Sequence, residues 1–187
     1  KHNLWIGTEK GLSCQFAGDE HFTHFEHDPH NPFSLNYGSI HCVYEDSNGY
    51  IWIGSDRGGL GLFNPTNRDF TRFAHNPDDP STLSSNRIYS IYEDQRRMLW
   101  IGTSSGLNSL NMKNGSFRHF TTNDGLPNDV IYGILEDEKT YLWLSTNRGL
   151  ARFHPFRGVM EEFDASDNLQ GEEFNAAASF RTSDGEM

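Results

Sequence analysis

Cysteine and long apolar runs are scarce in this sequence. It has two cysteines, Cys14 and Cys42, in 187 residues, too few for a disulfide framework or a four-ligand zinc site. A single disulfide between them remains an alternative. No apolar run approaches the roughly 18 residues that a membrane-spanning helix needs, and no signal-peptide pattern precedes the first strand-like segment. We therefore expect no direct membrane contact, and we interpret the chain as a piece of a longer protein.

Basic residues are also in the minority. The chain has 15 Lys and Arg against 26 Asp and Glu, a net charge of −11, and such a surface repels the phosphates of nucleic acids. No segment keeps a 3.6-residue apolar period, so we expect no substantial helix. The 18 glycines and 13% aromatic residues and the mean hydropathy of −0.69 are instead typical of an all-β chain.

The chain does contain a repeat. The phrase LWIGTEKGL at Leu4 returns as IWIGSDRGGL at Ile51, LWIGTSSGL at Leu99 and LWLSTNRGL at Leu142. Its tryptophans are separated by 47, 48 and 43 residues, and they are Trp5, Trp52, Trp100 and Trp143. An apolar segment ending in Glu-Asp precedes the last three copies, and Phe-x-x-Phe follows the first three. Each unit therefore reads as four short antiparallel strands joined by turns.

Four strands at a period in the forties predict a β-propeller blade. We expect an all-β fold with about four blades' worth of strands, a fragment of a larger propeller of the seven-bladed type. Sixteen strands are predicted, the last over Phe174–Thr182. Whether the blades close alone, pair with a second chain or belong to a larger ring stays open. The predicted units span residues 1–35, 36–83, 84–126 and 127–169, with a partial unit at 170–187.

These residues resemble the two-component regulator propeller repeat. The resemblance rests on Asp-x-x-Gly-x-Ile/Leu-Trp-Ile-Gly-Thr-x-x-Gly-Leu, on Phe-x-x-Phe and on loops such as HNPDDPSTLSSNRI (75–88), and it covers essentially the whole chain. It implies the periplasmic sensor region of an inner-membrane receptor. In that family a membrane helix leads to a histidine kinase or a diguanylate cyclase, and the ligands in gut Bacteroidetes are typically oligosaccharides. No kinase or cyclase module lies in this chain.

The internal repeat separates framework positions from candidate site positions. Residue types that recur in every unit are expected to be structural, which covers the four tryptophans together with Gly7, Gly54 and Gly102. Residues that differ between units and lie where the entering loops and the loops between second and third strands share a face are ligand-binding candidates. These are Tyr37, Asp56, Arg57, Arg87 and Arg148, with His41, Tyr89 and Tyr132 at one equivalent inner-strand position facing the axial channel.

The sequence gives weaker support to a catalytic or metal-binding site than to a ligand-binding site. His21, His24, His27 and His30 are three residues apart, but on a strand successive ones diverge, and two of them match repeat positions. The adjacent Glu-Asp pairs also diverge, and they recur where Asp caps a turn. The pair Gly58-Gly59 precedes a strand, which is not the setting of a phosphate-binding loop. We predict no catalytic residue, no metal site and no cofactor.

Three hypotheses follow. The first is a non-catalytic sensor module that binds an oligosaccharide or another small polar ligand, or relays a signal through the geometry of a homodimer. The second is a propeller enzyme acting on glycans, a hydrolase or lyase, which would need an acid/base pair or metal cluster breaking the repeat. The third is a protein-interaction scaffold that uses exposed blade edges. Neighbouring blades or a second chain are the expected protein partners.

Overall fold

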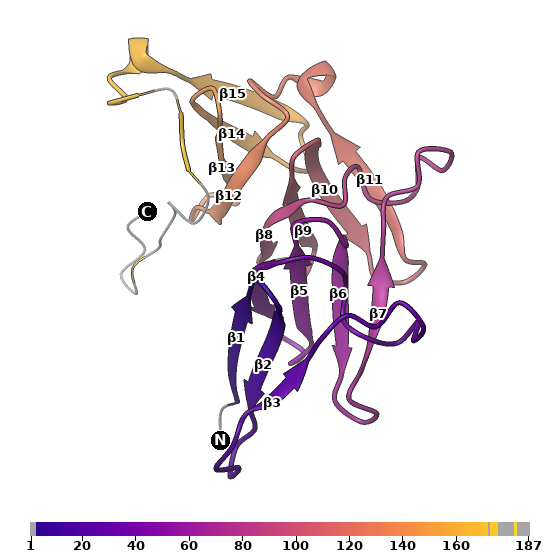
Figure 1. Cartoon of the computed structure of the whole chain (residues 1–187). Coiled ribbons are helices and arrows are strands. Elements are labelled where there is room, and N and C mark those ends of the chain that lie inside the picture. The colour runs from indigo at the N-terminus through magenta and orange to yellow at the C-terminus, as the bar shows by residue number, and fades with distance from the viewer. Residues whose placement is uncertain (1–2, 172, 176–181, 183–187) are drawn as a thin grey trace.

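Antiparallel sheets follow one another along the chain in the computed structural model, which describes residues 3–171, 173–175 and 182 (Figure 1). In this part, blade 1 has three strands and blades 2 to 4 have four strands each, hydrogen-bonded in sequence order. The strands are β1 (Leu4–Thr8), β2 (Gly11–Gln15) and β3 (Thr23–Phe25); β4 (Ile40–Glu45), β5 (Ile51–Ser55), β6 (Leu60–Asn64) and β7 (Asp69–Phe73); β8 (Ile88–Glu93), β9 (Leu99–Thr103), β10 (Gly106–Asn111) and β11 (Ser116–Phe120); and β12 (Ile131–Glu136), β13 (Leu142–Thr146), β14 (Leu150–His154) and β15 (Val159–Phe163).

This arrangement confirms the predicted all-β fold and the four-stranded blade. Fifteen strands are present among the described residues, and most of the sixteenth predicted strand, Phe174–Thr182, lies outside them. The helices of the described part are single turns, η1 (Thr122–Asp124) and η2 (Ala165–Asp167). Neither is long and apolar enough to cross a membrane.

A carboxylate clasp joins the first two strands of each complete blade. The Asp that directly follows the first strand accepts two backbone N–H groups of the turn with Oδ1, as Asp94 does from Arg96 and Met98, both at 2.9 Å. Its Oδ2 accepts the indole Nε1–H of the blade's tryptophan, Trp100, at 2.9 Å. The other two clasps have the same geometry and pair Asp46 with Trp52 at 2.9 Å and Asp137 with Trp143 at 3.0 Å. The turn-capping role of Asp was expected, whereas the bond to the repeat tryptophan was not.

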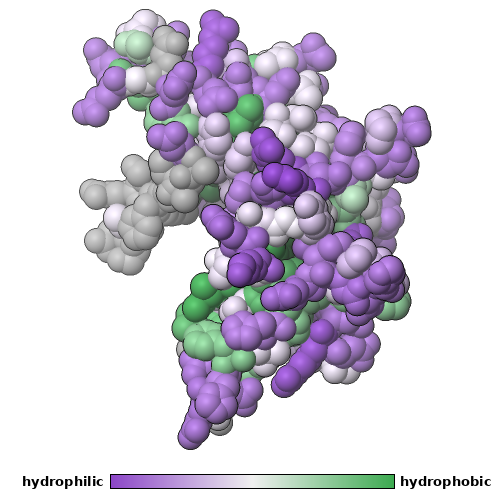
Figure 2. All heavy atoms as spheres, in the orientation of Figure 1, coloured by the Kyte–Doolittle hydropathy of each residue, from purple (hydrophilic) through white to green (hydrophobic). Residues whose placement is uncertain are grey.

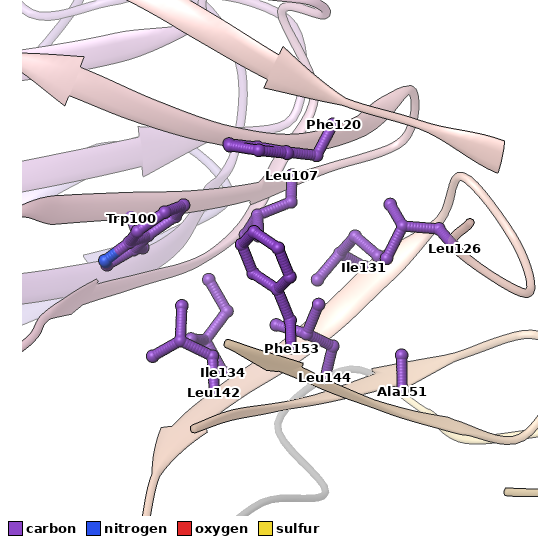
Figure 3. Close-up of a cluster of buried hydrophobic side chains, with 10 residues drawn as sticks. All are labelled: Trp100, Leu107, Phe120, Leu126, Ile131, Ile134, Leu142, Leu144, Ala151 and Phe153. Atoms are coloured by element: carbon purple, nitrogen blue, oxygen red, sulfur yellow. The ribbon is translucent and has the colours of Figure 1, made fainter. Parts of the chain in front are cut away.

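The core lies between blades. A separate cluster of buried apolar side chains fills each of the junctions 1–2, 2–3 and 3–4. At the junction of blades 3 and 4, Trp100 meets Phe153 of the next blade with ring centroids 6.0 Å apart, and Phe120 lies 4.9 Å from the same ring (Figure 3). Because a single blade cannot bury both of its faces, blade-to-blade stacking supplies the apolar burial that stabilises the fold.

The repeat glycines of the second strands lie where neighbouring blades approach most closely. A Cβ on Gly54 would lie 2.5 Å from Cys42 Sγ and 2.7 Å from Ile88 of the next blade. A Cβ on Gly7 would lie 2.7 Å from Ile40, and one on Gly102 would lie 2.7 Å from the carbonyl oxygen of Ile131. Any side chain at these positions would push two blades apart, which explains why glycine recurs there.

Both thiols are free, so no disulfide joins Cys14 and Cys42. Burial raises the pKa of the Cys14 thiol to about 11 and that of Cys42 to about 12. A raised pKa lowers the thiolate fraction at pH 8, so we expect Cys14 of the native protein to react roughly 100-fold more slowly with a thiol reagent than in urea, and Cys42 roughly 1,000-fold more slowly. Equal reaction rates for the two thiols with and without urea, or no reactive thiol in urea, would contradict this prediction.

Candidate functional site

A polar pocket opens on one face at the junction of blades 1 and 2, with a cavity volume of about 330 Å³. Its walls come from the loop between β1 and β2, the segment after β3, the loop entering β4 and the loop between β5 and β6. Entering loops and second-to-third-strand loops therefore share this face. The two kinds of loop are hydrogen-bonded to each other: the N–H of Asp56 donates to the carbonyl oxygen of Ser39 at 3.0 Å, and that of Ser104 donates to Arg87 at 3.1 Å.

Three of the residues predicted from the sequence line this pocket: Tyr37, Asp56 and Arg57. The Tyr37 side chain is 54% exposed, and the ring of His27 holds it edge-on with centroids 5.5 Å apart. Asp56 and Arg57 form an ion pair at 3.3 Å. The pocket thus offers an exposed aromatic face beside one carboxylate and one guanidinium.

Backbone crowding holds these groups in place. A Cβ on Gly58 would lie 2.6 Å from the backbone nitrogen of Tyr37, so the two loops meet main chain to main chain. Asn36 fastens the same contact because its side-chain amide donates to the carbonyl oxygen of Gly58 at 2.7 Å. The amide oxygen of Asn36 is buried and has no hydrogen-bond partner among the described residues.

The predicted inner-strand residues form an aromatic row across blades 2 to 4. The rings of His41 and Tyr89 are stacked 5.7 Å apart with an interplanar angle of 6°, and Tyr89 and Tyr132 follow at 4.9 Å. Nδ1–H of His41 donates to the carbonyl oxygen of Ile88 in the next blade at 3.0 Å. The row therefore also ties blade 2 to blade 3.

A β-bulge in each first strand produces the row. Ile40 and Cys42 pair with adjacent residues of β5, so His41 between them is an extra residue. Tyr89 and Tyr132 are the extra residues at the same place in β8 and β12. Because a bulge redirects the side chain of the unpaired residue, the three aromatic groups leave the blade-packing faces and line up with one another.

The two remaining candidates, Arg87 and Arg148, are not among the residues that line the pocket. Arg87 lies next to it, since its Nε donates to the carbonyl oxygen of Asp56 at 3.4 Å. Arg148 lies exposed on the loop between β13 and β14 of blade 4. Its backbone N–H donates to Thr146 Oγ1 at 2.9 Å. The structure does not bring Arg148 together with the other candidates.

Sequence reasoning missed several lining residues, namely Glu9, Glu26, His27 and Asn36. His27 and His75 occupy the same repeat position, and each holds an entering loop by donating from Nδ1 to a carbonyl oxygen, of Leu35 at 3.0 Å and of Leu83 at 2.6 Å. Asn36 could have been found by comparing the repeats, because the corresponding loop residue of blade 3 is a different one, Ser84. The Ser84 hydroxyl accepts a hydrogen bond from the side-chain amide of Asn108 at 2.8 Å.

Among the described residues, no group of three or more His, Cys, Asp and Glu side chains is placed to hold a metal ion. The aspartate of the blade 4 clasp has a lowered pKa because hydrogen bonds from Tyr141, Trp143 and Lys139 outweigh the opposing effect of burial. That carboxylate serves the fold, since its acceptor oxygens are occupied by the turn and the indole.

Comparisons with known proteins agree with this geometry. The model of the two component regulator propeller matches residues 34–57, 82–105 and 125–148. The extracellular domain of BT3049 from B. thetaiotaomicron, assigned to a hybrid two component system, is 26% identical with a TM-score of 0.77 over 86% of this chain and 23% of its own. The extracellular domain of BT4673 from the same organism, assigned to a one component system, is 21% identical with a TM-score of 0.80 over 97% and 26%.

More distant propellers share the fold alone. Virginiamycin B lyase from Staphylococcus aureus is 16% identical with a TM-score of 0.60, over 87% of this chain and 59% of the lyase. No curated protein matches the chain. The chain spans about a quarter of the length of the first two relatives.

Fold and site together define part of a β-propeller, whose antiparallel blades carry a polar pocket on one loop face. Three of its repeats match the model of the two component regulator propeller. The relatives in that comparison are extracellular domains of signalling systems.

Proposed function

We propose that this chain is a non-catalytic, periplasmic sensor module of a bacterial two-component or cyclic-di-GMP receptor, and that it binds an oligosaccharide or a similar small polar ligand. The observation that carries the proposal is the pocket at the junction of blades 1 and 2. Its position between two blades lets a bound ligand contact both of them at once. Binding changes receptor output only when the ligand prefers one of two receptor states.

The chemistry of the pocket suits a sugar. An exposed Tyr37 ring offers an apolar face for the C–H side of a pyranose, as aromatic side chains do in polar binding sites. Asp56 and Arg57 offer an acceptor and donors for hydroxyl groups. An apolar face with a few fixed polar groups is the usual composition of a small-molecule site.

The first test is thermal unfolding of the chain against a panel of plant, host and microbial oligosaccharides. A ligand present at about 100 times its Kd stabilises a protein by about 2.7 kcal/mol, which raises the Tm of a chain of this length by roughly 5–10 °C. A panel in which no sugar or other small polar compound raises the Tm would contradict the proposal.

Variants then localise the site. Tyr37→Ala and Asp56→Asn are expected to weaken binding of the identified ligand at least tenfold, since each removes one of the contacts that fix it. Tyr50→Ala is the matched control, because Tyr50 is similarly exposed at 45% but lies on the turn between β4 and β5, outside the pocket. Equal loss of affinity in all three variants would place the ligand elsewhere.

A further inference from the structure

A basic cavity lies on blade 3, at the end of the strands away from the polar pocket. Its volume is about 440 Å³, and its walls come from the turn between β8 and β9, the turn between β10 and β11, and the strands beside them. Because an antiparallel chain reverses at every turn, these two turns lie at the opposite end from the entering loops. Blade 3 packs against blade 2 on one side and blade 4 on the other, so the cavity belongs to a blade with both neighbours in place.

The sign of the charge distinguishes this cavity from the rest of the surface. Hydrophilic side chains cover most of the molecule in the view of Figure 2, so polarity alone does not mark a site. The chain has 26 acidic and 15 basic residues, yet three basic side chains and no acidic one line the cavity: Arg97, Lys113 and Arg118. The walls of the polar pocket, by contrast, carry residues of both signs.

The three cations are only weakly compensated within the fold. Arg97 pairs with one carboxylate, that of Glu93 at 3.9 Å, and its side chain is 62% exposed. Lys113 and Arg118 are exposed and form no ion pair within the described residues. The Arg118 guanidinium lies 4.7 Å from the centre of the Phe120 ring, a cation–π contact that orients the group and leaves its N–H groups available to an anion.

The same three cations break the repeat. The turn hydrogen bonds and the strand register identify the equivalent positions in the other blades. Blade 2 has Gly49, Thr66 and Thr71 at these positions, and blade 4 has Thr140, Phe156 and Glu161. Since neither neighbouring blade carries a positive charge there, the blade fold does not require one. Exposed charged residues that the fold does not require are candidates for binding.

The rest of the lining suits an organic anion better than a bare ion. Four apolar side chains contribute to the walls, and they are Met98, Leu110, Met112 and Phe117. Ser109 adds a hydroxyl and Asn111 a side-chain amide. Apolar surface with a few polar groups, in a volume of roughly 300–1,000 Å³, is the usual composition of a small-molecule site.

We propose that the basic cavity is a second ligand site, which binds an acidic sugar through carboxylate or sulfate groups. The anionic groups pair with Arg97, Lys113 and Arg118, and each guanidinium can hold two oxygens of one anionic group. The apolar walls receive the C–H face of the sugar, and its hydroxyl groups bond the neutral polar groups of the lining. The site does not depend on a ligand in the polar pocket, because the two lie on different blades and at opposite ends of the strands.

Calorimetry and NMR spectra of the ¹⁵N-labelled chain test the proposal with three trisaccharides. Trigalacturonate carries carboxylates, sulfated maltotriose carries sulfates, and maltotriose is the neutral control. We expect at least one acidic trisaccharide to bind at least about tenfold more tightly than maltotriose, with amide shifts centred on residues 97–98 and 109–118. Raising the ionic strength from about 0.02 to 0.3 M should weaken this binding. The acid that binds more tightly tells whether the site recognises carboxylate or sulfate.

Substitutions copied from blade 2 remove the charges with residues that a blade already accepts. Arg97→Gly, Lys113→Thr and Arg118→Thr should each weaken binding of the acidic trisaccharide about two- to fivefold, as expected for exposed ion pairs. The triple variant should lose at least about tenfold. Arg118→Lys should keep most of the affinity, which separates the charge from the contact with Phe120.

Two controls accompany these variants. Arg157→Asn removes an exposed cation from the equivalent turn of blade 4, between β14 and β15, and asparagine is the residue of blades 2 and 3 at that place. Tyr37→Ala alters the polar pocket. Both should leave the Kd of the acidic trisaccharide unchanged.

Four results would overturn the proposal. One is that neither acidic trisaccharide binds more tightly than maltotriose. A second is binding whose amide shifts fall on the polar pocket and spare the basic cavity. A third is a triple variant that loses no more affinity than Arg157→Asn. The last is inorganic sulfate binding as tightly as sulfated maltotriose, which would mean an adventitious ion only.

Discussion

Asp94→Ala is expected to lower the free energy of unfolding by about 3 kcal/mol or more. The variant removes the acceptor of two turn N–H groups and of the Trp100 indole at once. Asp94 is only 4% exposed, so water has little access to replace the carboxylate. In a chain of this length the loss corresponds to a fall in Tm of roughly 6–12 °C.

Urea unfolding followed by tryptophan fluorescence measures this loss. Asp94→Asn should fall between wild type and alanine, because one amide oxygen still caps the turn while the amide nitrogen cannot accept from the indole. Asp78→Ala is the matched control, since Asp78 is exposed in the loop between β7 and β8. If Asp94→Ala were no more destabilising than Asp78→Ala, the clasp would not hold the blade together.

Gly59→Ala is expected to destabilise the protein by about 3 kcal/mol as well. Gly59 has a φ of +76°, and a Cβ there would press into the carbonyl oxygen of Phe73. That carbonyl belongs to the strand pair β6–β7, in which Leu60 is registered with Phe73. The cost therefore combines a strained conformation with a steric clash against main-chain atoms.

Gly158→Ala separates the two contributions. Gly158 has a φ of +62°, but nothing lies within 4 Å of its ideal Cβ, so this variant carries only the conformational cost of about 1 kcal/mol. The difference between the two variants, measured by the same urea unfolding, is the steric contribution. Equal losses would show that the β6–β7 pair yields to the extra methyl group.

The blade architecture could be predicted because its signals are local. Strand alternation, the Asn48-Gly49 turn and the tryptophan period each depend on residues close together in the chain. Gly49 adopts the left-handed conformation that this turn requires, with a φ of +81°. Its backbone N–H donates to the carbonyl oxygen of Asp46 at 2.8 Å. Arg97 and Thr140 adopt the same left-handed conformation at the equivalent turns of blades 3 and 4, with φ of 67° and 65°, so the blade fixes this turn even where the local preference is weaker.

The candidate site was only partly predictable. Tyr37, Asp56 and Arg57 stood out because they differ between units, and the structure places them around one pocket. Arg148 stood out by the same test and lies on another blade. Sequence variation between units marks a residue as free to differ, but it does not say which loops meet.

The sequence by itself determined the strand order, the blade count within the described part and the framework role of the repeated Trp and Gly positions, because these depend on short-range pattern and repetition. Tertiary structure alone decided the bulges that align His41, Tyr89 and Tyr132 and the clasp between Asp and Trp. Each of these arises where two blades or two strands meet. Such contacts depend on register and on close approach across the fold, which no single segment encodes.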